Sequence, residues 1–394
     1  MRVTPEITIE QILKACPECE EFLYPFLEGV SEHTTLKHLA EEKTISLKAL
    51  MAGIERYIKR STQNPCDYTS MRRGLIKTGK VNIAGFTHFL LQDSIVEALR
   101  SEAAKKNIPL NLNLFPKHQK KYFQNYLAQC SSPDDLPDLL IGKGFSSLMS
   151  SRFYDKFVRP GFFKHPIESL KNKDVNELYD KQEAYHIFGL EETVMVYDHS
   201  VQAHGPKPKA WKDIMNAAYP QALTQMGKNG QDHFGFNILL YLYLEYGEAG
   251  IVHFASKVKN KQHFAYTIRH LGKKSERVAP VNIMHRHASR FIRSEAKNTT
   301  EIIAAAEGNP CSCYFFLLKH DAPQEAYTLA KQLLSERLQL QLEHCGITPI
   351  SAISQKPFQW VGWETLANLP LPYLKEQLAE LAFNHYQKPS YETL

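Results

Sequence analysis

The sequence has no long apolar run and no recognisable export signal. None of its apolar stretches approaches the ~20 residues that a membrane-spanning helix needs. Residues 1–10 carry acidic groups where the apolar centre of a secretory signal would lie. We therefore expect a cytoplasmic protein without a membrane span, periplasmic or lipid-anchored only where a leader has been removed.

Cysteine is scarce, and no charge sign dominates. Seven cysteines are scattered over 394 residues, and an odd, dispersed set in a long chain predicts free thiols rather than a disulfide framework. The formal net charge is only +5, and the lysines are spread along the chain. This distribution of charge does not indicate nucleic-acid binding, so we expect no nucleic acid as a partner.

Catalytic motifs are missing as well. The sequence has no nucleophile elbow, no Walker loop and no His-Glu-x-x-His, and the Gly-Lys-Gly at 142–144 is too short for a phosphate-binding P-loop. Catalytic triads assemble in space, so this absence alone excludes no enzyme. We predict a non-enzymatic protein.

Residues 1–60 are predicted to form a small all-helical domain. Thr8, Thr35 and Ser46 are candidate N-caps, each followed by a segment with helical spacing of apolar residues. Residues 61–79 are rich in turn-forming and charged residues, and we expect a linker there.

From residue 80 onward, strand and helix patterns alternate. Short buried strands are predicted at 81–85, 110–115 and 138–142, separated by helices at 91–105 and 119–129. This order is typical of a parallel, doubly wound α/β sheet. Such sheets bind ligands at the carboxyl ends of their strands, beside helix N-termini.

The stretch at 192–214 divides this α/β region. It begins as a strand around Val194, turns polar, and then passes two prolines that exclude a helix or a central strand. We interpret it as the crossing between two lobes. Lobe 1 is expected at about 80–195 and lobe 2 at about 205–310, with return segments and C-terminal helices at 311–394.

Polar residues follow two of the predicted strands in lobe 1. Thr87 and His88 lie at the first strand-to-helix turn, where backbone amides favour an anion; an ordinary loop is the alternative. Lys143, beside Gly144, would neutralise a carboxylate or phosphate, or be an ordinary surface lysine.

Other candidates lie on the crossing and in lobe 2. Asp198 and Ser200 would face the cleft, although Asp198 is equally suited to cap a turn. His285 and His287 follow a buried strand and would point to opposite faces, so at most one is expected in the cleft. A metal site built from His88, His285 and Asp198 is chemically reasonable.

The loop predicted at 307–313 adds Asn309 and Ser312 as hydrogen-bonding groups. The predicted ligand-binding residues are therefore Thr87, His88, Lys143, Gly144, Asp198, Ser200, His285, Asn309 and Ser312.

A metal is also conceivable in the helical domain. Cys16 and Cys19 have Cys-x-x-Cys spacing, but one such pair supplies only two of the four ligands that structural zinc needs. His33 and His38 would complete a site; two ordinary thiols near a helix start are the simpler interpretation. The weak metal-ligand candidates are Cys16, Cys19, His88 and His285.

The N-terminal pattern resembles a known domain. Ile7-Thr8-Ile9, Cys16-Pro17-Glu18, Phe22-Leu23 and Gly29 match a small helical domain of anaerobe proteins, also found at the N-terminus of iron–sulfur-cluster repair di-iron proteins. Many members carry a Cys-x-x-Cys pair near the glycine. This chain has Gly29-Val30-Ser31-Glu32-His33 there, so no cluster or redox role carries over from that pair.

Three later segments carry a second resemblance. They are the prolines and lysines before Trp211-Lys212-Asp213-Ile214, the run Glu307-Gly308-Asn309-Pro310 before an apolar strand, and the helix at 322–335. In this order they are similar to type II periplasmic solute-binding proteins, especially the iron(III) or small-anion ABC-transporter receptors. The resemblance implies two lobes that close about a hinge on a ligand. Ferric-binding members use adjacent tyrosines, and this sequence contains no Tyr-Tyr pair.

Three hypotheses about function follow. In the first, the chain is a cytoplasmic sensor or adaptor that binds a small anionic or metal-associated ligand between its lobes, and its N-terminal domain binds a protein partner. Alternatively, it is a homologue of ABC-transporter receptors, working outside the membrane. The third is a metal- or iron–sulfur-linked maintenance or redox factor that uses Cys16, Cys19 and histidines. No cofactor is specified; a metal ion or a small anion is the class that the residues allow.

Overall fold

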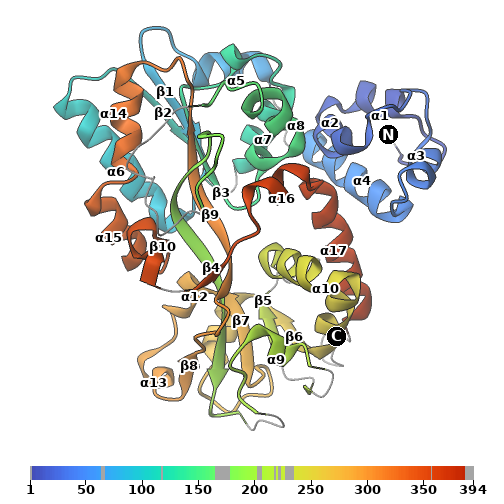
Figure 1. Cartoon of the computed structure of the whole chain (residues 1–394), viewed down its shortest axis with the longest axis vertical. Helices are drawn as coiled ribbons and strands as arrows, with labels where there is room; N and C mark the ends of the chain where they lie inside the picture. Colours follow the sequence, from blue (N-terminus) through green and yellow to red (C-terminus); the bar gives the residue numbers. More distant parts are fainter. Residues whose placement is uncertain are drawn as a thin grey trace.

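A helical unit at the N-terminus lies beside a two-lobed α/β body (Figure 1). The computed structural model describes residues 2–63, 67–116, 119–164, 178–201, 206–216, 219–220, 223–226, 235–355 and 357–386. The predicted two-lobed α/β fold with a preceding helical domain is confirmed. No helix within these ranges is long and apolar enough to cross a lipid bilayer.

The helical unit forms where the caps were predicted. Thr8 and Thr35 accept hydrogen bonds from the amides that open their helices, and Ser46 accepts one from Ala49. Phe22 is fully buried in the unit's core, and its ring lies directly over Gly53, where a Cβ would come within 2.1 Å of it. The helices are α1 (Ile9–Ala15), α2 (Glu20–Leu23), α3 (Leu36–Glu42) and α4 (Leu47–Gln63), with 3-10 turns at Pro17–Cys19 and Tyr24–Phe26.

The segment expected as a linker is mostly helical. Helix α4 continues to Gln63, and α5 (Tyr68–Leu75) begins at the N-cap Asp67, whose carboxylate accepts from the Ser70 amide. Met71 and Leu75, four residues apart, pack against the core of lobe 1. The cap and this apolar spacing outweigh the turn-forming residues, so α5 is part of the α/β body.

Lobe 1 contains the predicted parallel strands. The strand order is β2-β1-β3, with α6 following β1 and α7 following β2. Their bounds are β1 (Val81–Gly85), α6 (Phe89–Lys105), β2 (Leu110–Leu114), α7 (Lys120–Gln129) and β3 (Leu139–Lys143). Helix α6 packs with α14 (Gln324–Gln332) and α15 (Glu336–His344) on one face of the sheet, and α7 lies on the other (Figure 1).

Two long antiparallel strands join the lobes. The first half of β4 (His186–Asp198) pairs with β9 (Asn309–Leu318), and its second half pairs with β7 (Val281–His285) of lobe 2. Along its main path the sheet has the order β2-β1-β3-β9-β4-β7-β5-β6, in which β5 is Leu223–Met226 and β6 is Val258–Gln262. The sheet is therefore mixed rather than parallel throughout. The loop predicted at 307–313 lies largely in β9, because its residues pair with β4 and are buried.

Lobe 2 is built around α10 (Phe236–Lys257), which continues past a kink at Gly247, where φ is 66°. Trp211, fully buried, anchors α9 in the same core. The remaining elements are α8 (Ser151–Phe153), a π-helical turn (Tyr154–Val158), α9 (Trp211–Ile214), β5 (Leu223–Met226), β6 (Val258–Gln262), α11 (Phe264–His270), α12 (Arg286–Ser289), α13 (Ser294–Lys297), β8 (Thr300–Ile302), β10 (Thr348–Pro349), β11 (Phe358–Gln359), α16 (Trp363–Asn368) and α17 (Leu371–His385).

Helix α17 fastens the helical unit to both lobes. Its first turns contribute Leu371 and Leu374 to the core of lobe 1, whereas Leu378 and Ala382 lie in the core of lobe 2. Between them, Tyr373 belongs to the core of the helical unit, and its hydroxyl accepts a hydrogen bond from the Ser46 amide at 2.9 Å. The unit is thus packed onto the α/β body rather than tethered to it.

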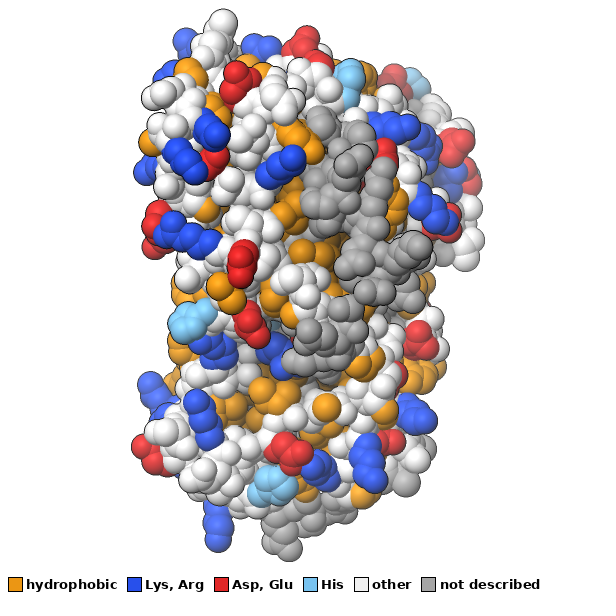
Figure 2. Space-filling view, turned by 60° about the vertical axis from the view of Figure 1, so that its left-hand side comes forward, with side chains coloured by type: hydrophobic (Ala, Val, Ile, Leu, Met, Phe, Trp, Pro, Cys, Tyr) orange, Lys and Arg blue, Asp and Glu red, His pale blue; other side chains and the backbone are white. Residues whose placement is uncertain are grey.

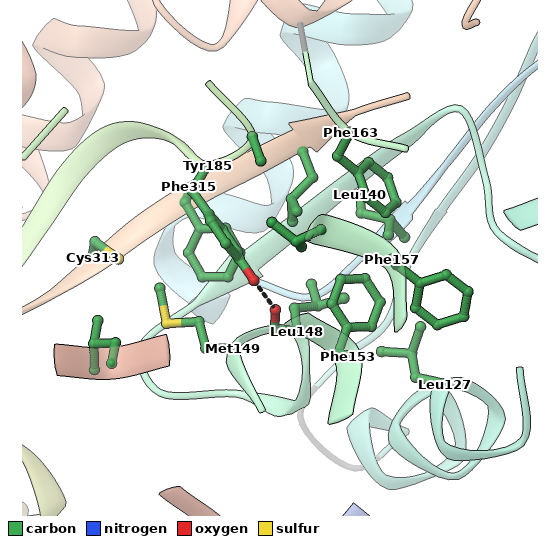
Figure 3. Close-up of a cluster of buried hydrophobic side chains, with 14 of the residues drawn as sticks. Leu127, Leu140, Leu148, Met149, Phe153, Phe157, Phe163, Tyr185, Cys313 and Phe315 are labelled. Atoms are coloured by element: carbon green, nitrogen blue, oxygen red, sulfur yellow. Dashed lines mark hydrogen bonds between the residues drawn. The ribbon is translucent and has the colours of Figure 1, made fainter. Parts of the chain in front are cut away.

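The core of lobe 1 is rich in aromatic rings. Phe153, Phe157 and Phe163 pack beneath the sheet, and Tyr185 lies against Phe315 of β9 (Figure 3). On the face of the molecule shown in Figure 2, the acidic and basic side chains of the described residues are interspersed.

Candidate ligand-binding site

Five charged or imidazole side chains meet where β4 passes from one lobe to the other. They are His88 at the start of α6, Lys143 at the end of β3, Glu191 in the middle of β4, His285 at the end of β7, and His287 in α12. We call this group the interlobe cluster. Lobe 1 supplies His88 and Lys143, and lobe 2 supplies the other two histidines.

Glu191 lies at the centre of the cluster. Its Oε1 accepts a hydrogen bond from Lys143 Nζ at 2.7 Å and another from the Tyr314 hydroxyl at 3.3 Å. His287 Nδ1 lies 3.2 Å from the same oxygen, and His285 Nδ1 lies 3.8 Å from Oε2. Burial by itself would raise the pKa of Glu191, but Lys143 and the two imidazoles hold it well below the usual range. Glu191 is therefore a buried carboxylate ion.

Two histidines of the cluster, His88 and His285, are held neutral. Burial, reinforced by Lys143 and His287, lowers the pKa of His88 to about 3. Burial also lowers the pKa of His285 to about 4, against the opposing effect of Glu191. The His88 and His287 rings are 4.3 Å apart, and those of His285 and His287 are 5.4 Å apart. The neutral imidazoles of His88 and His285 offer both N–H donors and lone pairs to a ligand.

The prediction that His285 and His287 point to opposite faces is wrong. It assumed that the chain stays extended, but β7 ends at His285 and α12 begins at Arg286. The helical turn brings the two rings nearly parallel, at 14°, on the same side. Both imidazoles consequently reach Glu191.

A second polar group lies next to the cluster. The Glu192 carboxylate accepts hydrogen bonds from Arg286 at 2.8 Å, from Asn309 at 2.9 Å and from the Thr348 hydroxyl. Asn309 is thus engaged by its amide nitrogen, while its Oδ1 is buried without a partner among the described residues. These bonds tie β4, β9 and α12 together at the point where the lobes meet.

Ser312 and Gly144 lie together and connect lobe 1 to α10. The Ser312 Oγ accepts a hydrogen bond from Asn237 at 3.0 Å, and a Cβ added to Gly144 would lie 3.7 Å from the same oxygen. Phe145 and Phe236 make an edge-to-face contact at 5.5 Å across the same junction. Thr87, beside His88, has a buried hydroxyl without a partner among the described contacts.

Asp198 and Ser200 do not reach the interlobe cluster. Asp198 is seven residues beyond Glu191 along β4, which at ~3.3 Å per residue is roughly 23 Å. Its buried carboxylate accepts from the Ser200 amide and hydroxyl and from the Gly272 amide. The structure thus agrees with the alternative in which Asp198 caps a turn.

The two proposed metal sites do not assemble. Asp198 is remote from His88 and His285, and no group of three or more His, Cys, Asp or Glu in the described part of the chain is arranged to hold a metal ion. Cys16 and Cys19 are buried thiols of the helical unit, and Cys16 donates to Glu18 at 3.4 Å. His33 and His38 are exposed on the surface.

Sequence reasoning missed Glu191 and Glu192. Both lie in a strand whose residues from 186 to 198 are all buried. Two adjacent carboxylates in an otherwise apolar, buried strand are a signal in themselves, because buried acids need cationic or hydrogen-bonding partners. Which partners they find depends on pairing between distant strands.

The depressed pKa values of the histidines predict a stability that falls in mild acid. Below about pH 6.5, the unfolded chain binds protons that His88 and His285, with folded pKa values of about 3 and about 4, do not. We expect the free energy of unfolding to fall by on the order of 5 kcal/mol between pH 6.5 and 4. Urea unfolding across this range measures it.

The matched variants are His88→Asn, which retains a residue suited to an N-cap, and His33→Gln at an exposed histidine. His88→Asn should reduce the change in the free energy of unfolding with pH, and His33→Gln should leave that change as it is in the wild-type chain. An unaltered pH dependence in His88→Asn would contradict this reading of the site.

Comparison with known proteins agrees with the observed fold. Structures of similar fold include a ferric binding protein from Campylobacter jejuni (TM-score 0.54, 13% identity, covering 78% of this chain and 99% of that one). Ferric iron-binding protein A from Mannheimia haemolytica in an open conformation is another (TM-score 0.55, 14% identity, 77% and 99%). A third is a Trichodesmium protein in complex with iron and citrate ligands (TM-score 0.51, 11% identity, 77% and 98%).

At these identities the structural likeness concerns the fold alone. None of the curated proteins compared with the chain matches it in sequence. The sequence profile of the bacterial extracellular solute-binding proteins, however, matches residues 134–369, which is more than half of the chain. The chain belongs to this family of solute-binding proteins.

Proposed function

We propose that the protein is a receptor that holds a small anionic ligand, free or as a metal complex, at the interlobe cluster. The single observation that carries this proposal is the convergence of Lys143, His88, His285 and His287 from both lobes around one buried carboxylate. A ligand bound by groups from both lobes favours the conformation in which the lobes are together.

The chemistry of the cluster favours an anion. Lys143 provides a positive charge, and the N-terminus of the 17-residue helix α6 presents backbone amides beside Thr87 and His88. The unpartnered Thr87 hydroxyl and the neutral imidazoles add further hydrogen-bond donors. Glu191 holds Lys143 in place. Because its negative charge repels an anion, an anion that leaves some of these donors without a hydrogen bond would bind weakly.

A bare metal ion suits the cluster less well. The Lys143 ammonium group lies 2.7 Å from the carboxylate that a metal ion would need, so a second cation there would be repelled. A metal already chelated by an organic acid presents carboxylate oxygens instead. The Trichodesmium protein, solved with iron and citrate, is an example of a similar fold with such a ligand.

A site of this kind suits two cellular roles, that of a transport receptor and that of a cytoplasmic sensor. We propose the sensor, with the helical unit as the part that meets a protein partner, because this unit is an addition to the two lobes and is packed on α17. Cell fractionation of the native organism with an antibody separates the two roles. Recovery outside the cytoplasmic membrane would contradict the sensor.

The ligand proposal predicts stabilisation by anions. A ligand that binds the folded chain at 100 times its Kd should raise the free energy of unfolding by about 2.7 kcal/mol and the Tm by several degrees. A thermal-shift screen should include phosphate, sulfate, molybdate, citrate and ferric citrate, with ferric and zinc salts alone. We expect at least one anion to stabilise the chain; stabilisation by bare metal ions only, or by nothing at millimolar concentration, would refute the proposal.

A further inference from the structure

A cavity lies on the other face of β9 from the interlobe cluster. Side chains alternate along a strand, and Tyr314 points to Glu191 whereas Phe315 packs against Tyr185 (Figure 3). The cavity beside Tyr185 has a volume of about 410 Å³, within the size range of small-molecule sites. Helix α16 forms one wall, and the segment before β4 forms another.

The cavity is lined by five aromatic residues. They are Tyr154, Tyr179, Tyr185, Trp360 and Trp363, and we call the cavity the aromatic pocket. The Trp363 ring stacks on Tyr185 at 4.8 Å and 15°, and Trp360 meets Trp363 edge to face at 5.3 Å and 67°.

Hydrogen bonds fix the orientation of these rings. Trp363 Nε1 donates to the Leu178 carbonyl at 2.9 Å, and the Tyr185 hydroxyl donates to the Leu148 carbonyl at 2.7 Å (Figure 3). Trp360 Nε1 is buried and has no hydrogen-bond partner among the described residues. An enclosed donor without a partner is uncommon, and an acceptor such as a water molecule or the hydroxyl of a ligand would satisfy it. The pocket is thus rigid and incompletely satisfied, as a preorganised binding site would be.

The charged residues that line the pocket leave one buried negative charge without a compensating positive charge. Lys181 and Glu364 form a 3.9 Å ion pair in which both side chains are almost fully exposed, so their effect is screened by solvent. Asp180 is only 5% exposed, and its carboxylate accepts hydrogen bonds from the Gln182, Ala184 and Tyr185 amides. These three bonds hold a negative charge at the pocket with no cationic partner among its lining residues other than the exposed Lys181.

We propose that the aromatic pocket binds a small organic cation of the quaternary-ammonium type. Aromatic faces carry negative partial charge and attract alkylated ammonium groups, and the buried Asp180 carboxylate adds a full charge of the same sign. Both features repel an anion. A neutral sugar also stacks on aromatic rings, but it gains nothing from the carboxylate charge. This site is separate from the interlobe cluster and does not depend on the function proposed there.

Tryptophan fluorescence provides a direct test on the full-length chain. The sequence has three tryptophans, and Trp211 is fully buried in lobe 2, so a change on binding reports on Trp360 and Trp363. Tetramethylammonium and choline are the probes. The control ligand is 3,3-dimethyl-1-butanol, which has the shape of choline without its charge.

We expect saturable quenching by choline and tetramethylammonium, with the neutral alcohol binding at least ~10-fold more weakly. Trp360→Leu should weaken choline binding by a similar factor, whereas Trp211→Phe should leave the affinity unchanged. Circular dichroism and the Tm identify a variant that fails to fold. If a variant fails to fold, the comparison of choline with the neutral alcohol on the wild-type chain alone tests the proposal. Equal binding of the two, binding of glucose without choline, or no saturation at tens of millimolar would each overturn the proposal.

Discussion

Replacing Glu191 by glutamine is expected to lower the free energy of unfolding by about 3 kcal/mol. The substitution keeps the size of the side chain but removes the charge that compensates Lys143, which is only 20% exposed. An uncompensated ammonium group in this position costs far more than the lost hydrogen bond alone. Urea unfolding of the purified variant, followed by circular dichroism, measures the loss.

Two further variants separate the charge effect from general damage. Lys143→Met combined with Glu191→Gln should recover about half of the loss, because neither charge is then left unpaired. Glu97→Gln removes one partner of an exposed ion pair with Arg337 and should cost no more than about 0.5 kcal/mol. If Glu191→Gln were as mild as Glu97→Gln, Glu191 would not be the centre of a buried charged group.

A second large loss is expected for Gly85→Ala. Gly85 ends β1, two residues before Thr87, and a Cβ there would lie 2.0 Å from the Ile141 carbonyl oxygen of β3. A backbone atom cannot rotate away, so β1 and β3 must separate, and the residue's φ of 156° adds strain for any residue with a side chain. We expect a loss of at least about 3 kcal/mol, measured by urea unfolding.

Gly74→Ala is the matched control for this substitution. Gly74 lies in α5, with nothing within 4 Å of its added Cβ, and should gain about 0.5 kcal/mol because alanine favours the helix. Equal effects at the two glycines would contradict the close approach of β1 and β3 that positions His88 and Lys143.

Local chemistry made much of the fold predictable. The caps at Thr8 and Thr35, the strand Val81–Gly85 and the helix after it depend on neighbours within a few residues. The same reasoning located His88 and Lys143, because both follow strands whose carboxyl ends share one edge of the sheet. These two residues do meet in the structure, next to His285.

Long-range pairing made the rest unpredictable. Residues 309–313 carry the turn-forming sequence Asn309-Pro310, yet they join β9 because β4 offers backbone partners more than 100 positions earlier. Glu191 meets Lys143, 48 residues before it, only because β9 pairs with both β3 and β4 and lies between them. Asp198 was expected in the cleft because it is polar and lies on the crossing. The length of β4 carries it to the far end of lobe 2 instead.

Calorimetric titration of the anion found in the screen tests the central claim most directly. It should be run on the wild-type chain, on Lys143→Met, and on Lys105→Met, a control at the exposed, opposite end of α6. We expect the affinity to fall at least ~10-fold in Lys143→Met, as for the loss of a charged hydrogen bond, and to be unchanged in Lys105→Met. Wild-type affinity in Lys143→Met would contradict a ligand site at the interlobe cluster.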